Sequence, residues 1–275
     1  MNMLSKKIDF AVIIGVKNAN PNGDPLNGNR PRVNYDGYGE MSDVCLKRKL
    51  RNRLMDDGES ILVQSDDYRS DEHRSIKSRY DANEEIQKLA KEKDGEKKAK
   101  TACAQWYDVR AFGQVLAGVD DTSASIAIRG PVSMQSAFSV LPVDVTSTQI
   151  TKSVNLITNE KDPSKKSGDT MGMKHRVDRG IYVSFGSINR QLADKTGFSD
   201  VDAEKLKHTL CKMFNNDESS ARPAGSMEII KVIWWTHEGV TLSSAKVHRG
   251  LDVGPDGTYK LEKFEGIVVQ ELDGQ

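Results

Sequence analysis

The sequence predicts an α+β sandwich, in which a sheet and helices pack face to face. Two strong strand signals, at residues 6–17 and 227–236, enclose a chain where helical and strand patterns follow one another. The order is strand, helix, helix, strand, hairpin, helix, strand, with two long polar insertions. This order fits an α+β sandwich better than a doubly wound sheet, and a ferredoxin-like β-α-β-β-α-β core with excursions is one candidate.

The first strand is predicted at residues 6–17, because the apolar run FAVIIGV lies within them. The next segment, 18–39, is dense in Asn, Gly and Pro and is predicted to be a loop. Its asparagines and glycines tolerate left-handed geometry, so successive amides can form an anion-binding nest close to Arg30 and Arg32. Taken alone, such a segment is more often only a long turn.

A helix is predicted to begin at Ser42, which is a good N-cap residue. Leu46, Leu50 and Leu54 recur at every fourth position and make one apolar stripe, and Gly58 is a suitable end. With the leucines facing the core, the cations of the helix are expected on the remaining surface, where phosphate would relieve their repulsion. A solvated face without a ligand is the alternative. The cations are Lys47, Arg48, Lys49, Arg51 and Arg53.

The middle of the chain is predicted to hold a charged insertion followed by two ordered segments. Residues 64–101 are poor in large apolar side chains, so the part at 81–100 is expected to be a solvated helix or a mobile insertion that anchors no core. Residues 103–118, CAQWYDVRAFGQVLAG, have the pattern of an amphipathic helix. Residues 125–140, SIAIRGPVSMQSAFSV, have that of a strand.

A protruding hairpin is predicted at residues 147–179, where two strand-like ends enclose the turn-forming sequence NEKDPSKKSGD. A helix is expected at 202–215, and a last strand-like segment, FEGIVVQEL, follows the strand at 227–236. An apolar wedge beside cations can unstack a base while the cations hold phosphates. The hairpin has both, in Met171, Met173, Lys174, His175 and Arg176.

The composition favours a neutral, soluble protein of the cytoplasm. Forty Lys and Arg balance forty Asp and Glu, so the basic excess of a free-standing nucleic-acid binder is absent. No segment approaches the roughly 18 consecutive apolar residues of a membrane span, and the start lacks the shape of a secretory signal. Cys45, Cys103 and Cys211 have no CxxC spacing and are expected to be reduced.

No sequence motif predicts catalysis. Nucleotide-binding loops and nucleophile elbows are missing, and the five histidines form no ligand pair, so neither a metal nor another cofactor is expected. Asp24 lies in the loop after the first strand, where a carboxylate can in principle support metal-dependent RNA cleavage. Turn formation is the favoured interpretation of Asp24.

Four segments occur in the order found in one known family. NPNGDPLNGNRPR follows the first strand, LKRKLR lies on the first helix, and YDVRAFGQV and IRGPVS come later. Together they resemble the Csd-type backbone subunit of type I-C CRISPR Cascade, a RAMP-like crRNA-binding family, from about Ile8 to about Trp235. Each segment is a modest signal, whereas the ordered set is specific.

The resemblance implies a modified RRM-like palm with helical finger insertions and a protruding β-hairpin thumb. Residues 1–275 would form a single palm domain with insertions, 56–101 a finger-like charged insertion and 147–179 the thumb. The resemblance also implies a non-catalytic subunit that polymerises head to tail along crRNA and presents its bases to target DNA. Its implied partners are companion Cascade subunits and a recruited helicase-nuclease. The alternatives are a metal-dependent endoribonuclease that uses Asp24, and a module that binds no nucleic acid.

The resemblance further implies where RNA binds. Binding is expected to be independent of sequence, because the bases of the guide must stay free to read the target. Ser42, at the start of the basic helix, is expected to offer hydroxyl and amide donors to phosphate, and one hairpin methionine is the candidate wedge. The predicted RNA contacts are Asn18, Asn20, Arg30, Arg32, Ser42, Lys47, Arg48, Arg51, Met171, Met173, Lys174, His175 and Arg176.

Overall fold

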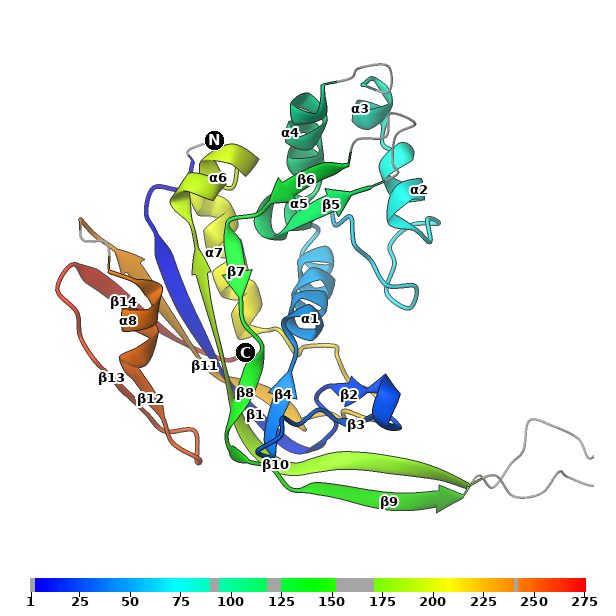
Figure 1. The fold of residues 1–275 in the computed structure, drawn as a ribbon, viewed down its shortest axis with the longest axis vertical. Helices are drawn as coiled ribbons and strands as arrows, with labels where there is room; N and C mark the ends of the chain where they lie inside the picture. Colours follow the sequence, from blue (N-terminus) through cyan, green and yellow to red (C-terminus); the bar gives the residue numbers. More distant parts are fainter. Residues whose placement is uncertain (1–2, 90–93, 118–124, 152–170, 240–241) are drawn as a thin grey trace, which may run out of the picture.

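The computed structural model describes residues 3–89, 94–117, 125–151, 171–239 and 242–275. Its centre is an antiparallel sheet in the order β14-β11-β1-β10-β8-β4, and β7 and β9 pair with other stretches of β10 (Figure 1). The predicted α+β class is confirmed. The strands of this sheet are β1 (Ile8–Ala19), β4 (Tyr38–Met41), β7 (Val132–Met134), β8 (Ala137–Pro142), β9 (Val145–Thr151), β10 (Met171–Ile188), β11 (Met227–His237) and β14 (Ile267–Asp273).

Two helices, α1 (Asp43–Asp56) and α7 (Asp200–Cys211), pack on one face of the sheet and enclose the main core. The predicted leucine stripe of α1 is buried there, and Phe10 of β1 stacks on Trp234 of β11 with 5.7 Å between ring centroids. Each fully buried Leu or Phe side chain contributes roughly 1.5–3 kcal/mol to folding. The helix predicted from Ser42 is confirmed, because Ser42 is the N-cap of α1.

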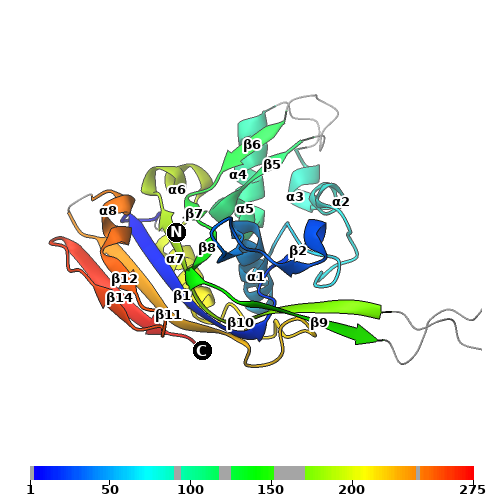
Figure 2. The same cartoon turned by 60° about the horizontal axis from the view of Figure 1, so that its bottom comes forward.

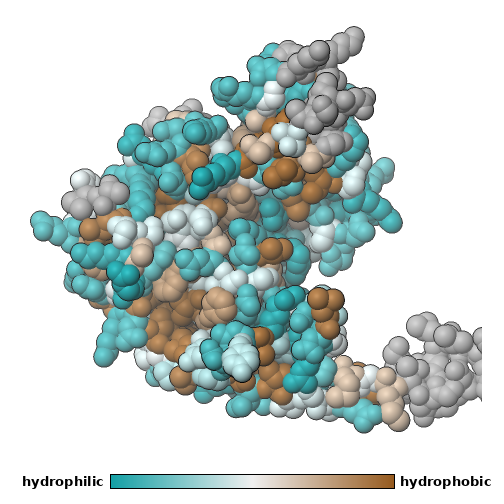
Figure 3. All heavy atoms as spheres, viewed as in Figure 1, coloured by the Kyte–Doolittle hydropathy of each residue, from teal (hydrophilic) through white to brown (hydrophobic). Residues whose placement is uncertain are grey.

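The opposite face of the sheet is covered only in part. The helix α8 (Ser244–Arg249) and the hairpin of β12 (Leu251–Val253) and β13 (Tyr259–Leu261) bury a small cluster around Trp235. Apolar side chains remain visible beside this hairpin in the space-filling view (Figure 3). None of the helices within the described residues is long and apolar enough to cross a bilayer.

A second apolar cluster lies outside the main sheet, beside α1. Leu62, Tyr80, Ile86, Trp106 and Leu116 are buried in it. The expectation that 81–100 anchors no core is therefore wrong at Ile86, because aromatic partners from neighbouring segments supply the apolar surface that this stretch lacks. The elements around the cluster are α2 (Ile76–Asp81), α3 (Glu84–Gln87), α4 (Gly95–Gln105), α5 (Tyr107–Phe112), β5 (Gly113–Leu116) and β6 (Ile126–Arg129).

The prediction of one helix at 103–118 is wrong. The chain is extended at Trp106, between α4 and α5, and α5 ends at Gly113, whose φ is 79°. A Cβ at Gly113 would lie 2.3 Å from the carbonyl oxygen of Ile128, so only glycine permits this approach. The residues after it pair with β6 as β5.

Two other predicted elements have different bounds in the structure. The strand predicted at 125–140 is divided into β6, β7 and β8, because Gly130 and Pro131 separate the first two. The helix predicted at 202–215 begins earlier, since Ser199 and Asp202 form a capping box at the start of α7.

Within the segment predicted to be a hairpin, β9 pairs with the first part of β10 from Val145–Val177 out to Thr151–Met171. This two-stranded arm extends away from the body of the molecule (Figures 1 and 2). The turn of the predicted hairpin, 152–170, lies outside the described residues. The arm is called the hairpin below.

Candidate nucleic-acid interface

The loop after β1, the start of α1 and the hairpin lie next to one another on one side of the sheet (Figures 1 and 2). The loop contains β2 (Gly23–Asp24), a short 3-10 helix η1 (Pro25–Asn27) and β3 (Arg30–Pro31), and β2 pairs with β3. The predicted RNA contacts lie in these three regions, apart from Asn18 at the end of β1 and Arg51 farther along α1, so this geometry decides which side chains are available to a ligand.

Polar side chains of the loop hold the loop together. Asn20 is only 4% exposed, and its Nδ2 donates to the carbonyl oxygen of Asn29 at 2.6 Å. The Oδ1 of Asn22 accepts from both the backbone N of Ser42, at 2.9 Å, and the Ser42 Oγ, at 3.0 Å. The expectation that Ser42 offers free donors to phosphate is therefore wrong, because Asn22 already uses both. Asn18 is exposed, with a φ of 55°.

Asp24 has a structural role in this loop. Its Oδ1 accepts from the backbone N of Leu26 at 3.2 Å and so caps η1. The same oxygen lies 3.5 Å from Nη2 of Arg32. This matches the turn-forming interpretation of Asp24. Within the described residues, no group of three or more His, Cys, Asp and Glu side chains can hold a metal ion.

The prediction that all five cations of α1 cover its surface is wrong. Lys49 and Arg53 are 1% and 3% exposed. Arg53 donates to the Tyr68 hydroxyl at 2.7 Å and forms an ion pair with Asp56. The helix is enclosed by the sheet and α7 on one side and by the second apolar cluster on the other, so a single leucine stripe underestimates its buried surface.

Lys49 is held by a buried carboxylate. Nζ of Lys49 donates to Asp217, and this carboxylate also accepts from Nε of Arg222 at 2.9 Å. The same Nζ lies 5.4 Å from the centre of the Phe214 ring. Burial lowers the pKa of Lys49, and the Asp217 carboxylate opposes this shift. Lys49 therefore stabilises the contact between α1 and the chain after α7.

Arg51, which was predicted to bind RNA, is also directed into the protein. Its Nε donates to Oδ2 of Asp108 at 2.9 Å, and its guanidinium lies 5.3 Å from the centre of the Phe112 ring. Asp108 is 1% exposed and also accepts from the backbone N of Leu62 and Val63. The pair ties α1 to the second apolar cluster, and only 13% of the Arg51 side chain is exposed.

Two cations of α1 remain available to a ligand. Lys47 forms an ion pair with Asp43, one turn earlier on the helix, at 2.9 Å. Arg48 has no ion pair with any residue that the structure describes, although its charge helps to lower the pKa of Asp67 after the stronger effect of a hydrogen bond from Ser65. Among the five cations of α1, Arg48 is therefore the one whose charge is least neutralised by a carboxylate within the described residues.

The alternation of the hairpin strands separates the predicted wedge from the predicted cations. Met171, Met173 and His175 share one face, and Lys174 and Arg176 lie on the other. The two methionine side chains are 66% and 54% exposed. Nε2 of Gln149 donates to the sulfur of Met171 at 2.8 Å across the ladder. The hairpin thus presents its two exposed methionines on one face and its two cations on the other, which also carries Ile150.

The loop contacts the methionine face of the hairpin. Nη1 of Arg30 donates to Oγ of Ser147 at 2.9 Å, and this Oγ lies 2.8 Å from Nδ1 of His175 on the opposite strand. Arg30 and His175 were both predicted to bind RNA. The structure brings them together through Ser147, and at least one Arg30 donor is occupied.

The sequence-based predictions missed the residues that pair with these cations and accept hydrogen bonds from these donors. A carboxylate partner distant in sequence, such as Asp217 or Asp108, leaves no local signal. Asn22 could have been noticed, since it lies in an Asn-rich loop next to a predicted N-cap. The two-residue period of the hairpin could also have separated Met173 from Lys174.

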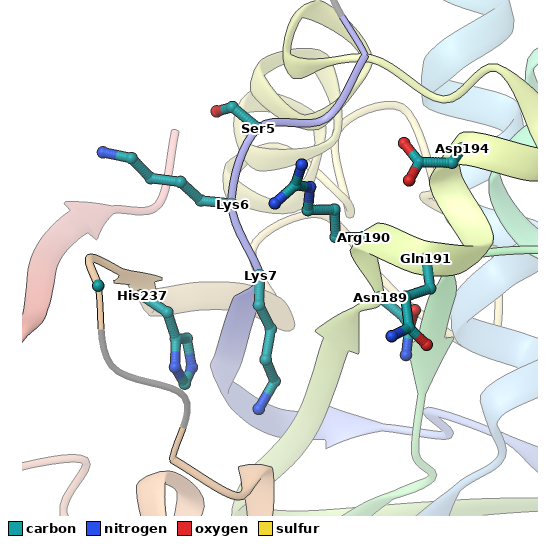
Figure 4. A pocket seen from close by; sticks show the side chains of 9 residues that line it. Ser5, Lys6, Lys7, Asn189, Arg190, Gln191, Asp194 and His237 are labelled. Carbon is teal, nitrogen blue, oxygen red and sulfur yellow. The ribbon is translucent and has the colours of Figure 1, made fainter.

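A cavity of about 540 Å³ lies elsewhere, between β1, β11 and the helix α6 (Arg190–Thr196) (Figure 4). Two of its cations are paired, Lys6 with Glu238 and Lys7 with Asp9. Its lining residues come from the start of β1, the end of β11 and α6, and α6 lies near the N-terminus, at the opposite end of the molecule from the hairpin (Figure 1). It is therefore separate from the candidate interface.

Comparisons with known proteins agree with the fold. The family model for CRISPR-associated protein Cas7 matches residues 6–270. CRISPR-associated protein Cas7 of Haloferax volcanii is 26% identical over 277 residues, which cover 95% of this chain and 79% of that protein.

One solved structure has a similar fold. A chain of a CRISPR RNA-guided surveillance complex, pre-nicking, is 16% identical with a TM-score of 0.52, over 88% of this chain and 81% of that one. A chain of another CRISPR RNA-guided surveillance complex is 16% identical with a TM-score of 0.46, over 92% and 77%. The match of the family model over nearly the whole sequence identifies the chain as a member of the CRISPR-associated Cas7 family.

Proposed function

We propose that this chain is a non-catalytic backbone subunit of a CRISPR RNA-guided surveillance complex of the type I-C Cascade kind. It binds the phosphate backbone of crRNA independently of sequence and leaves the bases to pair with a target DNA strand. Membership of the Cas7 family supports this proposal. The four ordered segments that resemble the type I-C subunit support the subtype.

One observation carries the RNA-binding proposal: the face of the hairpin that bears the two exposed methionines lies on the same side of the molecule as α1, which still offers Lys47 and Arg48 (Figures 1 and 2). Met171 and Met173 are neighbouring large apolar side chains that are 66% and 54% exposed on one face of the paired strands, and exposed apolar side chains that lie together often mark a binding surface. Arg48 and Lys47 supply positive charge from α1. Such a pair of surfaces can hold a single strand by its phosphates while an apolar side chain displaces a base.

The hand-like division follows from the same proposal. The elements β1, α1, β8, β10, α7 and β11 follow one another in the β-α-β-β-α-β order, and their strands lie in the order β11-β1-β10-β8. We assign them to an RRM-like palm. The charged insertion at 56–101 would be part of the fingers, and the hairpin at 147–179 the thumb.

The proposed assembly is a head-to-tail filament of copies along crRNA. A chain with forty cations and forty anions suits this, because its surfaces can meet without net repulsion. The partners would be companion Cascade subunits and a recruited helicase-nuclease, in the cytoplasm.

Nuclease protection of a long single-stranded RNA, with imaging of the same sample, tests the proposal. Evenly spaced protection together with rod-like or helical particles is the expected result for two RNAs of unrelated sequence. Protection of only one sequence would contradict backbone binding. Cutting that needs a divalent metal and disappears in Asp24→Ala would favour the endoribonuclease alternative instead.

A further inference from the structure

The hairpin is fastened to the body of the protein at its base. Val145 and Val177 form the innermost pair of its ladder and pack against the main core. The next pair on the same face, Ser147 and His175, is where Arg30 attaches. Farther out, among the described residues of the arm, no side-chain hydrogen bond or ion pair reaches the rest of the chain. Arg30 therefore makes the outermost polar contact.

The donors and acceptors at this contact form a chain. Arg30 can only donate, so Ser147 Oγ accepts from it. The same Oγ lies 2.8 Å from Nδ1 of His175 and shares a hydrogen bond with it, in which the hydroxyl donates when the ring hydrogen is on Nε2 and accepts when it is on Nδ1. Arg30, Ser147 and His175 thus join the loop to both strands of the hairpin.

Arg30 projects from a stiff part of the loop. Its strand β3 pairs with β2, and the carbonyl oxygen of Asn29 is bonded by the buried Asn20. Asn22 connects the same loop to Ser42 at the start of α1. The start of the basic helix is therefore connected to the hairpin through the loop, by side-chain hydrogen bonds at both ends and by the pairing of β2 with β3 between them.

We propose that Arg30, Ser147 and His175 form a polar latch that fixes the angle of the hairpin relative to α1, and that Arg30 is a positioning residue rather than a phosphate ligand. The role of the latch in RNA binding rests on the proposed function, whereas the contact between the three residues does not depend on it. From the latched pair to Met171 the arm runs about 13 Å, so a rotation of roughly 10° at the latch moves the methionine by about 2 Å. The latch thereby sets the width of the proposed RNA track.

Amide hydrogen exchange of the RNA-free protein tests the latch itself. Ser147→Val removes the hydroxyl. The matched variant Ser147→Thr introduces a side chain of the same shape as valine but keeps the hydroxyl. We expect exchange at 145–151 and 171–177 to rise roughly fivefold in Ser147→Val, the factor that corresponds to about 1 kcal/mol for one hydrogen bond. Ser147→Thr and the opposite-face control Thr148→Val should stay near the wild type. Equal exchange in Ser147→Val and Ser147→Thr would overturn the latch.

RNA binding then separates positioning from phosphate contact. If Arg30 positions the hairpin, Arg30→Ala and Ser147→Val lower the affinity alike, the double variant is no worse than either, and the salt dependence is unchanged. A phosphate ligand would behave differently: Arg30→Ala alone would lower the salt slope by about 0.7, and Ser147→Val would have no effect. That second pattern would overturn the positioning role.

The two experiments, hydrogen exchange and RNA binding, also distinguish failure of the latch from failure of the proposed function. If wild-type protein binds no RNA while Ser147→Val still loosens the hairpin, the RNA-binding proposal fails and the latch holds. If RNA binds normally and the hairpin exchanges equally in every variant, the latch fails and the RNA-binding proposal holds.

Discussion

The helix α1 and the hairpin both carry clusters of cations, but they use them in opposite ways. On α1, the side chains of Lys49, Arg51 and Arg53 are largely buried and each is bonded to a carboxylate, two of which, Asp217 and Asp108, come from other elements. On the hairpin, Lys174 and Arg176 are exposed on one face of an arm that extends into solvent, where Arg176 has only an exposed ion pair with Asp178, two residues farther along its strand, at 3.3 Å. A similar sequence signal therefore corresponds to fold stability in one region and to an accessible charge in the other.

The difference shows that the neighbours of a basic cluster decide its role more than its density does. A helix between two apolar clusters has little free surface, and a cation buried there needs a partner. An arm of two strands has no such neighbours. Substitutions on α1 should therefore affect stability, and those on the hairpin should affect RNA binding.

The largest effect is expected for Asp217→Ala. This change leaves the buried ammonium of Lys49 without its carboxylate, and uncompensated buried charges cost about 3–5 kcal/mol. Chemical denaturation measures the loss. The matched control is Asp81→Ala, which removes an exposed ion pair with Lys77 and should cost under about 1 kcal/mol. Equal losses in the two variants would contradict an internal role for the α1 cations.

A second internal pair predicts a pH effect. Burial by itself would raise the pKa of Asp202, but hydrogen bonds from Arg110 and Ser199 outweigh it and lower this pKa below its ordinary value of 3.8. The folded protein then binds this proton more weakly than the unfolded one, so the pair stabilises above pH 3.8 and its contribution is lost as pH falls through the lowered pKa.

Asp202→Asn should therefore lower stability near neutral pH by roughly 1.5–3 kcal/mol and flatten the acid side of the stability curve. Denaturation midpoints from neutral to acidic pH check this. Asp194→Asn, an exposed carboxylate on α6, is the control and should change neither. If the stability of Asp202→Asn fell with decreasing pH just as that of the wild type does, other carboxylates would determine the acid side of the stability curve.

On the hairpin, Lys174→Glu with Arg176→Glu should weaken RNA binding without loss of stability. Two contacts of about 1 kcal/mol each correspond to an affinity on the order of 30-fold lower, and the salt slope should fall by about 1.4. Fluorescence anisotropy at several salt concentrations measures both. The control Lys195→Glu with Lys260→Glu reverses two exposed charges away from the hairpin. A similar loss in this control would mean that net charge, not the hairpin, holds the RNA.

The smallest effect is expected for Met173→Ala. Losing an apolar contact to an unstacked base should lower affinity several-fold, on the order of 1 kcal/mol. The clearer readout is the fluorescence of 2-aminopurine in the RNA, which rises on unstacking and should rise less with this variant. Ile150→Ala, on the opposite face of the arm, is the control. A full fluorescence rise in Met173→Ala would assign the wedge to another residue.

The sequence predicted the features that depend on local pattern. The apolar run of β1, the leucine stripe of α1 and its N-cap at Ser42 all have a periodic or neighbouring signal, and the structure has them. The sequence-based predictions failed where residues distant in sequence determine whether a side chain is exposed or where a helix ends. Asp217 takes Lys49 out of the surface, and the close approach of Gly113 to Ile128 ends a helix that the apolar pattern would have continued.

The predicted RNA contacts follow the same division. Exposure of Met171 and Met173 agrees with a protruding hairpin, and alternation places Lys174 on the other face. Ser42 and Arg51 could not be judged from the sequence, because the groups that occupy their donors, Asn22 and Asp108, are brought to them by the fold.

Photo-crosslinking to RNA tests the central claim most directly. A photoreactive amino acid replaces Met173 on the hairpin, Arg48 on α1 or, as the control, Lys260 on β13. The account predicts RNA cross-links from the first two positions, for unrelated RNA sequences, and none above background from the third. Cross-links from Lys260 without any from Met173 and Arg48 would contradict an RNA track between the hairpin and α1.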